Sequence, residues 1–204
     1  MSKIKILKGD GIVNICIYGA SSVKTKDSFI IQTEELGKKL AQRGHSLVYG
    51  GGANGLMGAA ARGFTSGGGQ VIGVAPSFFK ADGVLYEKCT EFIPTETMRE
   101  RKKIMEEKSD AFVVTPGGIG TYDEFFEILT LKQLGRHSKT IAVFNIDGYF
   151  EELDLLMKKA VSENLLMEKS MELYGIFDNA NELIEYIETT KHDTVRISDV
   201  KFVK

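Results

Sequence analysis

The 204-residue sequence has little of several features that mark particular classes of protein. It has two cysteines, Cys16 and Cys89, which form no Cys-x-x-Cys motif, so a disulfide scaffold is not expected, and we interpret Cys16 as a buried structural thiol. Its longest apolar stretches, such as residues 12–18, are far shorter than the roughly 20 residues of a membrane-spanning helix. The N-terminus lacks an apolar region with a cleavage site. We therefore expect a cytoplasmic protein without a membrane partner.

No charge of one sign dominates the sequence. It has 26 lysines and arginines against 28 aspartates and glutamates, which leaves a net charge of -2. Such a chain has no overall basic field to attract nucleic acid, so any phosphate site must be local. The histidines His45, His137 and His192 stand alone, without the spacing of metal ligands, and are expected at the surface or in loops. We expect neither a metal nor a cofactor.

Glycine, in contrast, is abundant. The chain has 22 glycines and only 3 prolines, whereas average usage would give glycine about 7% of the residues. Because glycine weakens helices and strands, the excess must lie where the backbone turns sharply or comes close to another group.

Apolar runs of strand length alternate with segments of helical periodicity. Strands are predicted at residues 12–18, 46–49, 70–75, 91–93, 111–115, 140–144 and 173–177, and helices at 27–43, 54–65, 96–107, 121–134, 150–164 and 180–189. Nearly continuous apolar strands of this kind are typical of a mostly parallel sheet with helices on both faces. We predict a single, doubly wound α/β domain over residues 1–190 and a C-terminal tail over 191–204.

The first glycine cluster follows the second predicted strand. Gly50, Gly52 and Gly55 fit the GxGxxG pattern between a strand and a helix, which is the context for phosphate or dinucleotide binding. A dinucleotide site also needs an acidic residue about 20 positions later, and residues 71–79 contain none. A mononucleotide site is therefore favoured over NAD. Close packing explains further glycines of this cluster, notably Gly63, Gly67, Gly68 and Gly69.

The second glycine cluster is more informative. Gly117, Gly118 and Gly120 lie between a predicted strand and a helix expected to begin near Thr121. Glycines at this spacing let several N–H groups point at one place, where the positive end of the helix dipole adds to their attraction for an anion. The Walker A pattern GxxxxGK[ST] occurs nowhere. The cluster therefore predicts a phosphate site without the usual apparatus of triphosphate hydrolysis.

Two neighbouring groups of charged residues each allow two interpretations. Glu124 follows Thr121 by three positions, so it could complete a capping box or reach the sugar attached to a bound phosphate. The cations Arg99, Arg101, Lys102 and Lys103 lie among glutamates, and from their pattern alone they are interpreted as a solvated surface network of ion pairs.

Three segments together resemble the Lonely Guy (LOG) family, whose signature is PGGxGTxxE with an upstream Met-x-x-Arg-Lys. They are residues 49–58, 98–102 and 116–124, and residues 18–22 and 133–135 also fit the family's pattern. The resemblance covers roughly residues 13–188. It implies a Rossmann-like fold and a homodimer. Many members carry the label lysine decarboxylase, which we reject here because nothing in the sequence suggests a pyridoxal phosphate site.

The resemblance implies a nucleoside 5'-monophosphate phosphoribohydrolase. Members cleave the N-glycosidic bond of cytokinin riboside 5'-monophosphates, and often of AMP, to give the free base and ribose 5-phosphate. The family's essential arginine and glutamate fall on Arg101 and Glu124, which are the expected catalytic residues. The expected substrate-binding residues are Ser21, Met98, Arg101, Lys102, Gly117, Gly118, Ile119, Gly120 and Thr121.

Two other functions remain open. One is a non-catalytic nucleotide or molybdenum cofactor carrier of the same fold, and the other is a broader purine and pyrimidine 5'-nucleotide nucleosidase. The presence of both Arg101 and Glu124 at the family's spacing favours the hydrolase. The sequence departs from plant members at Arg99, where they commonly have histidine.

Overall fold

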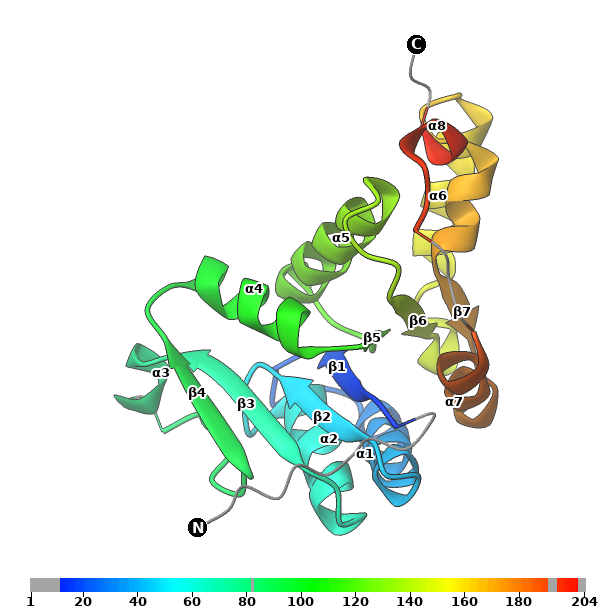
Figure 1. The fold of residues 1–204 in the computed structure, drawn as a ribbon. Coiled ribbons are helices and arrows are strands. Elements are labelled where there is room, and N and C mark those ends of the chain that lie inside the picture. Colours follow the sequence, from blue (N-terminus) through cyan, green and yellow to red (C-terminus); the bar gives the residue numbers. More distant parts are fainter. Residues whose placement is uncertain (1–11, 82, 191–193, 202–204) are drawn as a thin grey trace.

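A single sheet of seven parallel strands organises the chain (Figure 1), in a computed structural model that describes residues 12–81, 83–190 and 194–201. The strands are β1 (Asn14–Tyr18), β2 (Ser46–Tyr49), β3 (Val71–Pro76), β4 (Glu91–Thr95), β5 (Ala111–Val114), β6 (Thr140–Phe144) and β7 (Gly175–Phe177). The helices are α1 (Asp27–Gln42), α2 (Gly55–Ser66), α3 (Phe78–Ala81), α4 (Met98–Lys108), α5 (Ile119–Gln133), η1 (Ile146–Gly148), α6 (Glu151–Ser162), η2 (Glu168–Leu173), α7 (Ala180–Thr189) and α8 (Ile197–Val200).

The sheet is covered by helices on both faces, as the apolar strands predicted. Side chains alternate along each strand, so Ile15 and Ile17 of β1 enter one core while Cys16 and Tyr18 enter the other. Helices α1, α2 and α7 close the first core, and α4, α5 and α6 close the second. The predicted Rossmann-like, doubly wound architecture is confirmed. Burial raises the pKa of the Cys16 thiol to about 12, in keeping with the predicted structural role.

The strand order β4-β3-β2-β1-β5-β6-β7 places the chain reversal between β1 and β5. In doubly wound sheets, ligands bind beyond the carboxyl ends of the strands at such a reversal. The segments after β1, β2 and β5 therefore meet at one edge of the sheet, and both glycine clusters lie in them.

Several glycines of the first cluster serve helix packing, as predicted. A Cβ atom on Gly63 would lie 2.1 Å from the carbonyl oxygen of Glu34 in α1, and one on Gly67 would lie 2.7 Å from the carbonyl oxygen of Lys38. Any side chain at these positions would push α2 away from α1.

His45 and His137 lie in loops, which is one of the two positions expected, but both side chains are buried. Each ring nitrogen has a partner there; His45 Nδ1, for example, accepts from the Val13 N–H, and its Nε2 contacts Glu188. Helix α5 begins at Ile119, two residues before the expected start, because the glycine turn already has helical geometry there.

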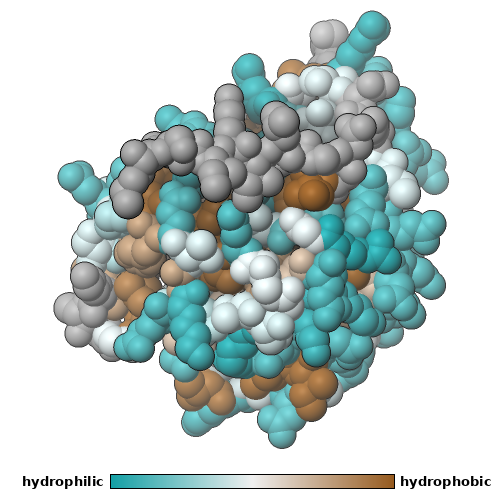
Figure 2. Space-filling view, turned by 60° about the horizontal axis from the view of Figure 1, so that its bottom comes forward, coloured by the Kyte–Doolittle hydropathy of each residue, from teal (hydrophilic) through white to brown (hydrophobic). Residues whose placement is uncertain are grey.

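Within the described part of the tail, α8 packs on η2. The carbonyl oxygen of Val200 accepts a hydrogen bond from Ser170 Oγ at 2.7 Å, and the Val200 side chain is buried. His192 lies outside the described residues. Of the helices that the structure describes, none combines the length and apolar character needed to cross a membrane. On the face drawn in Figure 2, hydrophobic residues emerge in separate patches among hydrophilic ones.

Lys132, on the inner side of α5, is a buried lysine without a hydrogen-bond partner for Nζ among the described residues. Burial lowers its pKa from 10.5 to about 8. The folded protein must therefore hold a desolvated charge at neutral pH, at a cost of about 3 kcal/mol for this shift.

We predict that Lys132→Met stabilises the protein at pH 7 by up to about 3 kcal/mol, since a methionine fills the same space without a charge. Between about pH 8 and pH 10.5 the unfolded chain binds the extra proton, so wild-type stability rises with pH and the advantage of the variant shrinks. Urea unfolding at pH 7 and pH 10 measures both values. An unchanged or lower stability of the variant at pH 7 would contradict this account.

Candidate active site

A cleft of about 720 Å³ opens at the carboxyl ends of β1, β2 and β5. Its walls come from the β1 turn, the first glycine cluster, α4 and the start of α5. The lining residues are Gly19, Ala20, Ser21, Ser22, Gly50, Gly52, Asn54, Met57, Phe79, Val84, Leu85, Met98, Arg99, Arg101, Lys102, Gly118, Ile119, Gly120, Thr121, Asp123 and Glu124. Its size is that of a typical small-molecule site.

A buried ion pair lies at the wall of the cleft. Arg101 from α4 donates from Nη1 to Oε1 of Glu124 in α5 at 2.7 Å, and both side chains are more than nine-tenths buried. Arg101 Nε also donates to the carbonyl oxygen of Val74 in β3, at 3.2 Å. The interpretation of Arg101 as part of a surface network is therefore wrong, because its guanidinium group lies against the sheet instead of in solvent.

The same contact decides between the two interpretations of Glu124. The residue that caps α5 is Gly118, Thr121 lies inside the helix, and the Glu124 carboxylate contacts Arg101. The capping-box interpretation is wrong for this reason. Burial raises the pKa of Glu124 above its usual value, although the neighbouring Arg101 opposes that rise. A buried carboxylate of raised pKa next to a cleft is suited to accepting a proton.

Lys102 forms a second charged contact at the cleft. Its Nζ lies 2.9 Å from Asp123 and 2.7 Å from Glu127, both on α5. Burial favours the neutral amine, but these two carboxylates outweigh it and raise the pKa of Lys102. Arg99, one turn away, is exposed at the cleft and has no ion-pair partner among the described residues. Arg99, Arg101 and Lys102 of α4 thus occupy three different environments.

The N-terminus of α5 presents donors to the cleft. Within the described part of the chain, no protein oxygen accepts from the backbone N–H groups of Gly118, Ile119, Gly120 or Thr121. These groups lie at the positive end of a 15-residue helix. Such an arrangement binds anions, and phosphate in particular.

The N-terminus of α2 is organised differently. The carbonyl oxygen of Ala20, in the β1 turn, accepts from the N–H groups of Leu56 and Met57 at 2.8 and 3.3 Å. Gly55 has φ +58, and a Cβ there would lie 2.4 Å from the same oxygen. The first glycine cluster therefore joins two loops of the protein, while the second leaves its donors available to a ligand.

Most of the sequence-predicted substrate residues line this cleft, namely Ser21, Met98, Arg101, Lys102, Gly118, Ile119, Gly120 and Thr121. Gly117 is buried and is not among the lining residues, and a Cβ there would lie 2.1 Å from Thr121 Oγ1. Sequence reasoning missed an apolar part of the wall formed by Met57, Phe79, Val84 and Leu85.

Hydrogen bonds between segments distant along the chain hold the Val84 and Leu85 part of this apolar wall in place. Residues 83–86 cross the first glycine cluster, where the Ala53 N–H donates to Val84 O at 2.8 Å and the Tyr86 N–H donates to Gly51 O at 2.9 Å. Neither segment carries a local pattern that specifies this contact.

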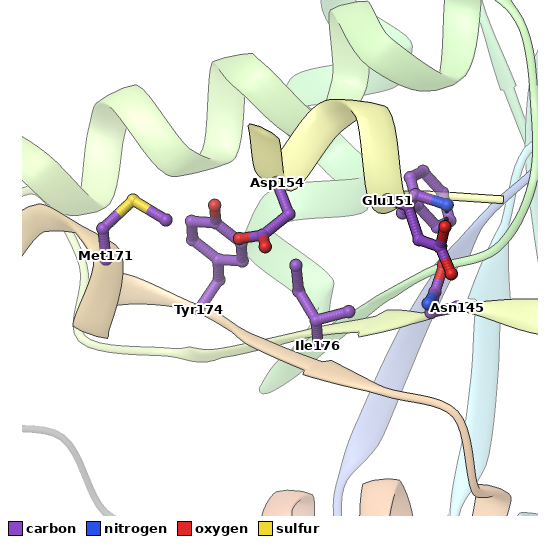
Figure 3. A pocket seen from close by; sticks show the side chains of 7 residues that line it. Asn145, Glu151, Asp154, Met171, Tyr174 and Ile176 are labelled. Carbon is purple, nitrogen blue, oxygen red and sulfur yellow. Dashed lines mark hydrogen bonds between the residues drawn. The ribbon is translucent and has the colours of Figure 1, made fainter. Parts of the chain in front are cut away.

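A second, smaller cavity of about 300 Å³ lies between β6, β7 and α6 (Figure 3). Asp154 and Glu151 from α6 face it together with Asn145 and Tyr174. Asn145 is already engaged, because its side-chain amide donates to Asp178 at 2.7 Å. The charged residues that line this smaller cavity are acidic, which does not suit binding of a phosphate. In the described part of the chain, no group of three or more histidine, cysteine, aspartate and glutamate side chains could hold a metal ion.

Comparison with protein families places most of the chain in one of them. A family model described as "possible lysine decarboxylase" matches residues 57–187. A cytokinin riboside 5'-monophosphate phosphoribohydrolase of Arabidopsis thaliana is 34% identical over 88% of this chain and 85% of its own length. One from Oryza sativa subsp. japonica is 38% identical over 85% of this chain and 72% of its own length.

Solved structures show the same fold at lower identity. The molybdenum cofactor carrier protein of Chlamydomonas reinhardtii superposes with a TM-score of 0.66 at 23% identity, covering 86% of this chain and 96% of its own. The molybdenum cofactor binding protein of Rippkaea orientalis gives 0.65 at 23% identity, covering 89% and 97%. At this identity the likeness is one of fold alone.

Gly50 allows the close approach of Arg101, which provides a test of the buried pair. A Cβ at Gly50 would lie 2.0 Å from Arg101 Nη2, so Gly50→Ala must displace the guanidinium group from Glu124. We expect the pKa of Glu124 to rise further, because burial remains while the opposing charge moves away. The carboxyl ¹³C shift of Glu124, assigned with Glu124→Gln and followed against pH, measures it.

Gly120→Ala is the matched control, since a Cβ there meets nothing within 4 Å. It should leave the pKa of Glu124 unchanged. An unchanged pKa in Gly50→Ala as well would show that Arg101 does not control the charge of Glu124.

Proposed function

Because the chain belongs to the Lonely Guy (LOG) family, which the "possible lysine decarboxylase" model describes, we propose that it hydrolyses the N-glycosidic bond of cytokinin riboside 5'-monophosphates. The products are the free base and ribose 5-phosphate. The curated relatives at 34–38% identity bear the name of this activity, and the chain covers more than two thirds of the length of each one compared above.

The observation that carries the proposal is the position of the Arg101–Glu124 pair beside the open N-terminus of α5. A substrate whose 5'-phosphate binds the N–H groups of residues 118–121 has its sugar held at a fixed distance from that phosphate. Glu124 is one turn further along the same helix and lines the same cleft. One helix thus supplies both the anchor and the carboxylate.

Glu124 is the proposed catalytic carboxylate. Cleavage of an N-glycosidic bond passes through a ribosyl cation-like state, and a carboxylate near the anomeric carbon stabilises the developing charge. Its raised pKa also brings it closer to the range in which a carboxylate takes a proton from water efficiently. Arg101 favours the ionised form of Glu124 and orients its carboxylate. The planar guanidinium group donates to both Glu124 and Val74, a geometry that lysine does not reproduce.

The remaining cleft residues suit the rest of a nucleotide. Thr121 and the amides of residues 118–120 would bind the phosphate, and Ser21 and Lys102 line the same cleft. The apolar wall of Met57, Phe79 and Leu85 is suited to stacking against a base. We further propose that AMP is a substrate, that the protein acts as a homodimer, and that it works in the cytoplasm.

A carrier of the same fold is the competing function, and it too could bind a phosphate at the open N-terminus of α5. A carrier has no need of a buried carboxylate held by an arginine at the cleft wall, since an ion pair of this kind is costly to desolvate. Tight binding of a 5'-monophosphate without release of base would favour the carrier.

We expect the purified protein to release isopentenyladenine from its riboside 5'-monophosphate and adenine from AMP, measured by chromatography of the free bases. Glu124→Gln should lower turnover by about 10²- to 10⁴-fold, because it removes the charge and the proton acceptor together. Glu107→Gln, which changes an exposed glutamate on α4, is the control and should leave turnover unchanged. Full activity of Glu124→Gln would refute the assigned role.

The phosphate should also control which substrates are used. Adenosine lacks the group that binds the N-terminus of α5, so we expect its kcat/KM to be at least about 10²-fold below that of AMP, corresponding to several charge-assisted hydrogen bonds. Steady-state kinetics with the two substrates measures the ratio. Equal values would exclude residues 118–121 as the phosphate site.

A further inference from the structure

Tyr149 makes a contact with the phosphate loop that the proposed reaction does not by itself explain. It lies between η1 and α6, and its hydroxyl donates a hydrogen bond to the carbonyl oxygen of Gly117 at 2.5 Å. The two residues are 32 positions apart, so the bond joins the segment after β6 to the segment after β5.

The tyrosine ring is held in place from two sides. It packs edge-on against Phe29 of α1, with ring centroids 5.7 Å apart, and against Phe150, with centroids 5.0 Å apart. The turn before it is tied to α1 as well. Asp147, which has φ 53, accepts hydrogen bonds from Ser28 at 2.7 Å and from Gln32 at 3.2 Å. These contacts fix the position of the Tyr149 hydroxyl group.

The bond determines which way one peptide unit faces. The Gly117 carbonyl and the Gly118 N–H belong to the same trans peptide, so they point in opposite directions. Gly117 is buried and is not among the lining residues of the cleft, whereas Gly118 lines it. While Tyr149 holds the carbonyl on the far side, the N–H of Gly118 must face the cleft.

Without that bond the peptide unit could turn over. A flip of this unit changes ψ of Gly117 and φ of Gly118, and glycine on both sides removes the steric barrier that other residues would impose. The flipped unit would present a carbonyl oxygen, instead of an N–H, to an anion in the cleft.

Tyr122, in the first turn of α5, lies near the same hydroxyl group. Its pKa is raised to about 12, first by burial and then by the neighbouring Tyr149. Since the only hydroxyl hydrogen of Tyr149 goes to the Gly117 carbonyl, Tyr149 has no further proton to donate.

We propose that Tyr149 is a positioning residue for the substrate's 5'-phosphate, which fixes the Gly117–Gly118 peptide so that its N–H faces the cleft. The identity of the ligand rests on the proposed function. The direction of the peptide does not, and any phosphate monoester at the N-terminus of α5 should respond to it.

Tyr149→Phe tests the proposal, because it keeps the ring between Phe29 and Phe150 and removes only the hydroxyl. Tyr174→Phe is the matched control. It removes a buried hydroxyl that has no hydrogen-bond partner in the described part of the chain and that lies outside this cleft. Thermal unfolding checks that both variants fold.

Binding of ribose 5-phosphate is measured by calorimetry, and turnover of AMP and adenosine by release of adenine. Tyr149→Phe should raise the Kd of ribose 5-phosphate and the KM of AMP by about tenfold, as expected for one hydrogen bond to a charged group. It should change kcat by less than about threefold, and leave kcat/KM for adenosine unchanged. Tyr174→Phe should leave all of these values at those of the wild type.

The outcomes separate the two proposals. If the wild-type protein binds ribose 5-phosphate but releases no base, and Tyr149→Phe weakens that binding, the hydrolase is wrong and the positioning role stands. If AMP is cleaved and Tyr149→Phe binds ribose 5-phosphate within twofold of the wild type, the positioning role is wrong. An equal loss for adenosine and AMP, or the same loss in Tyr174→Phe, would also overturn it, as would no binding of ribose 5-phosphate by the wild type.

Discussion

The buried ion pair between Arg101 and Glu124 is the interaction on which the candidate site depends. Two charges removed from water are expensive, so such a pair persists only when further contacts satisfy it. Here the sheet supplies one of these contacts, the Val74 carbonyl in β3, and the absence of a side chain at Gly50 leaves space for the guanidinium group. The pair joins α4 to α5 above the point of chain reversal, and so places a carboxylate where a ligand would lie.

The two glycine clusters support this arrangement in different ways. In the first, Gly55 lets the Ala20 carbonyl approach the N-terminus of α2, which uses up donors of that helix and fixes the wall of the cleft. In the second, Gly118 and Gly120 leave the donors of α5 open toward the cleft. The protein thus has two glycine turns before helices. The donors at one helix N-terminus are bound by the Ala20 carbonyl, and those at the other are free to bind an anion.

Local patterns were enough to predict the strands, the longer helices and the glycine turn before α5, because apolar periodicity and glycine spacing act over a few residues. They were not enough to predict what depends on distant contacts. The resemblance to a family singled out Arg101 and Glu124, but the burial of Arg101 was not predicted, since the charges around it are typical of a surface helix. The Tyr149 bond and the pairing of residues 83–86 with the first glycine cluster had no signal in the sequence, because each joins segments that are distant along the chain.

The central claim is that this cleft breaks the bond between base and sugar while the phosphate stays on the sugar. Phosphorus-31 NMR of AMP incubated with the purified protein tests it most directly. The account predicts that the AMP signal is replaced by that of ribose 5-phosphate, with adenine released in equal amount and no inorganic phosphate formed. Inorganic phosphate with adenosine, or an AMP signal that only broadens as the protein binds it, would contradict the account.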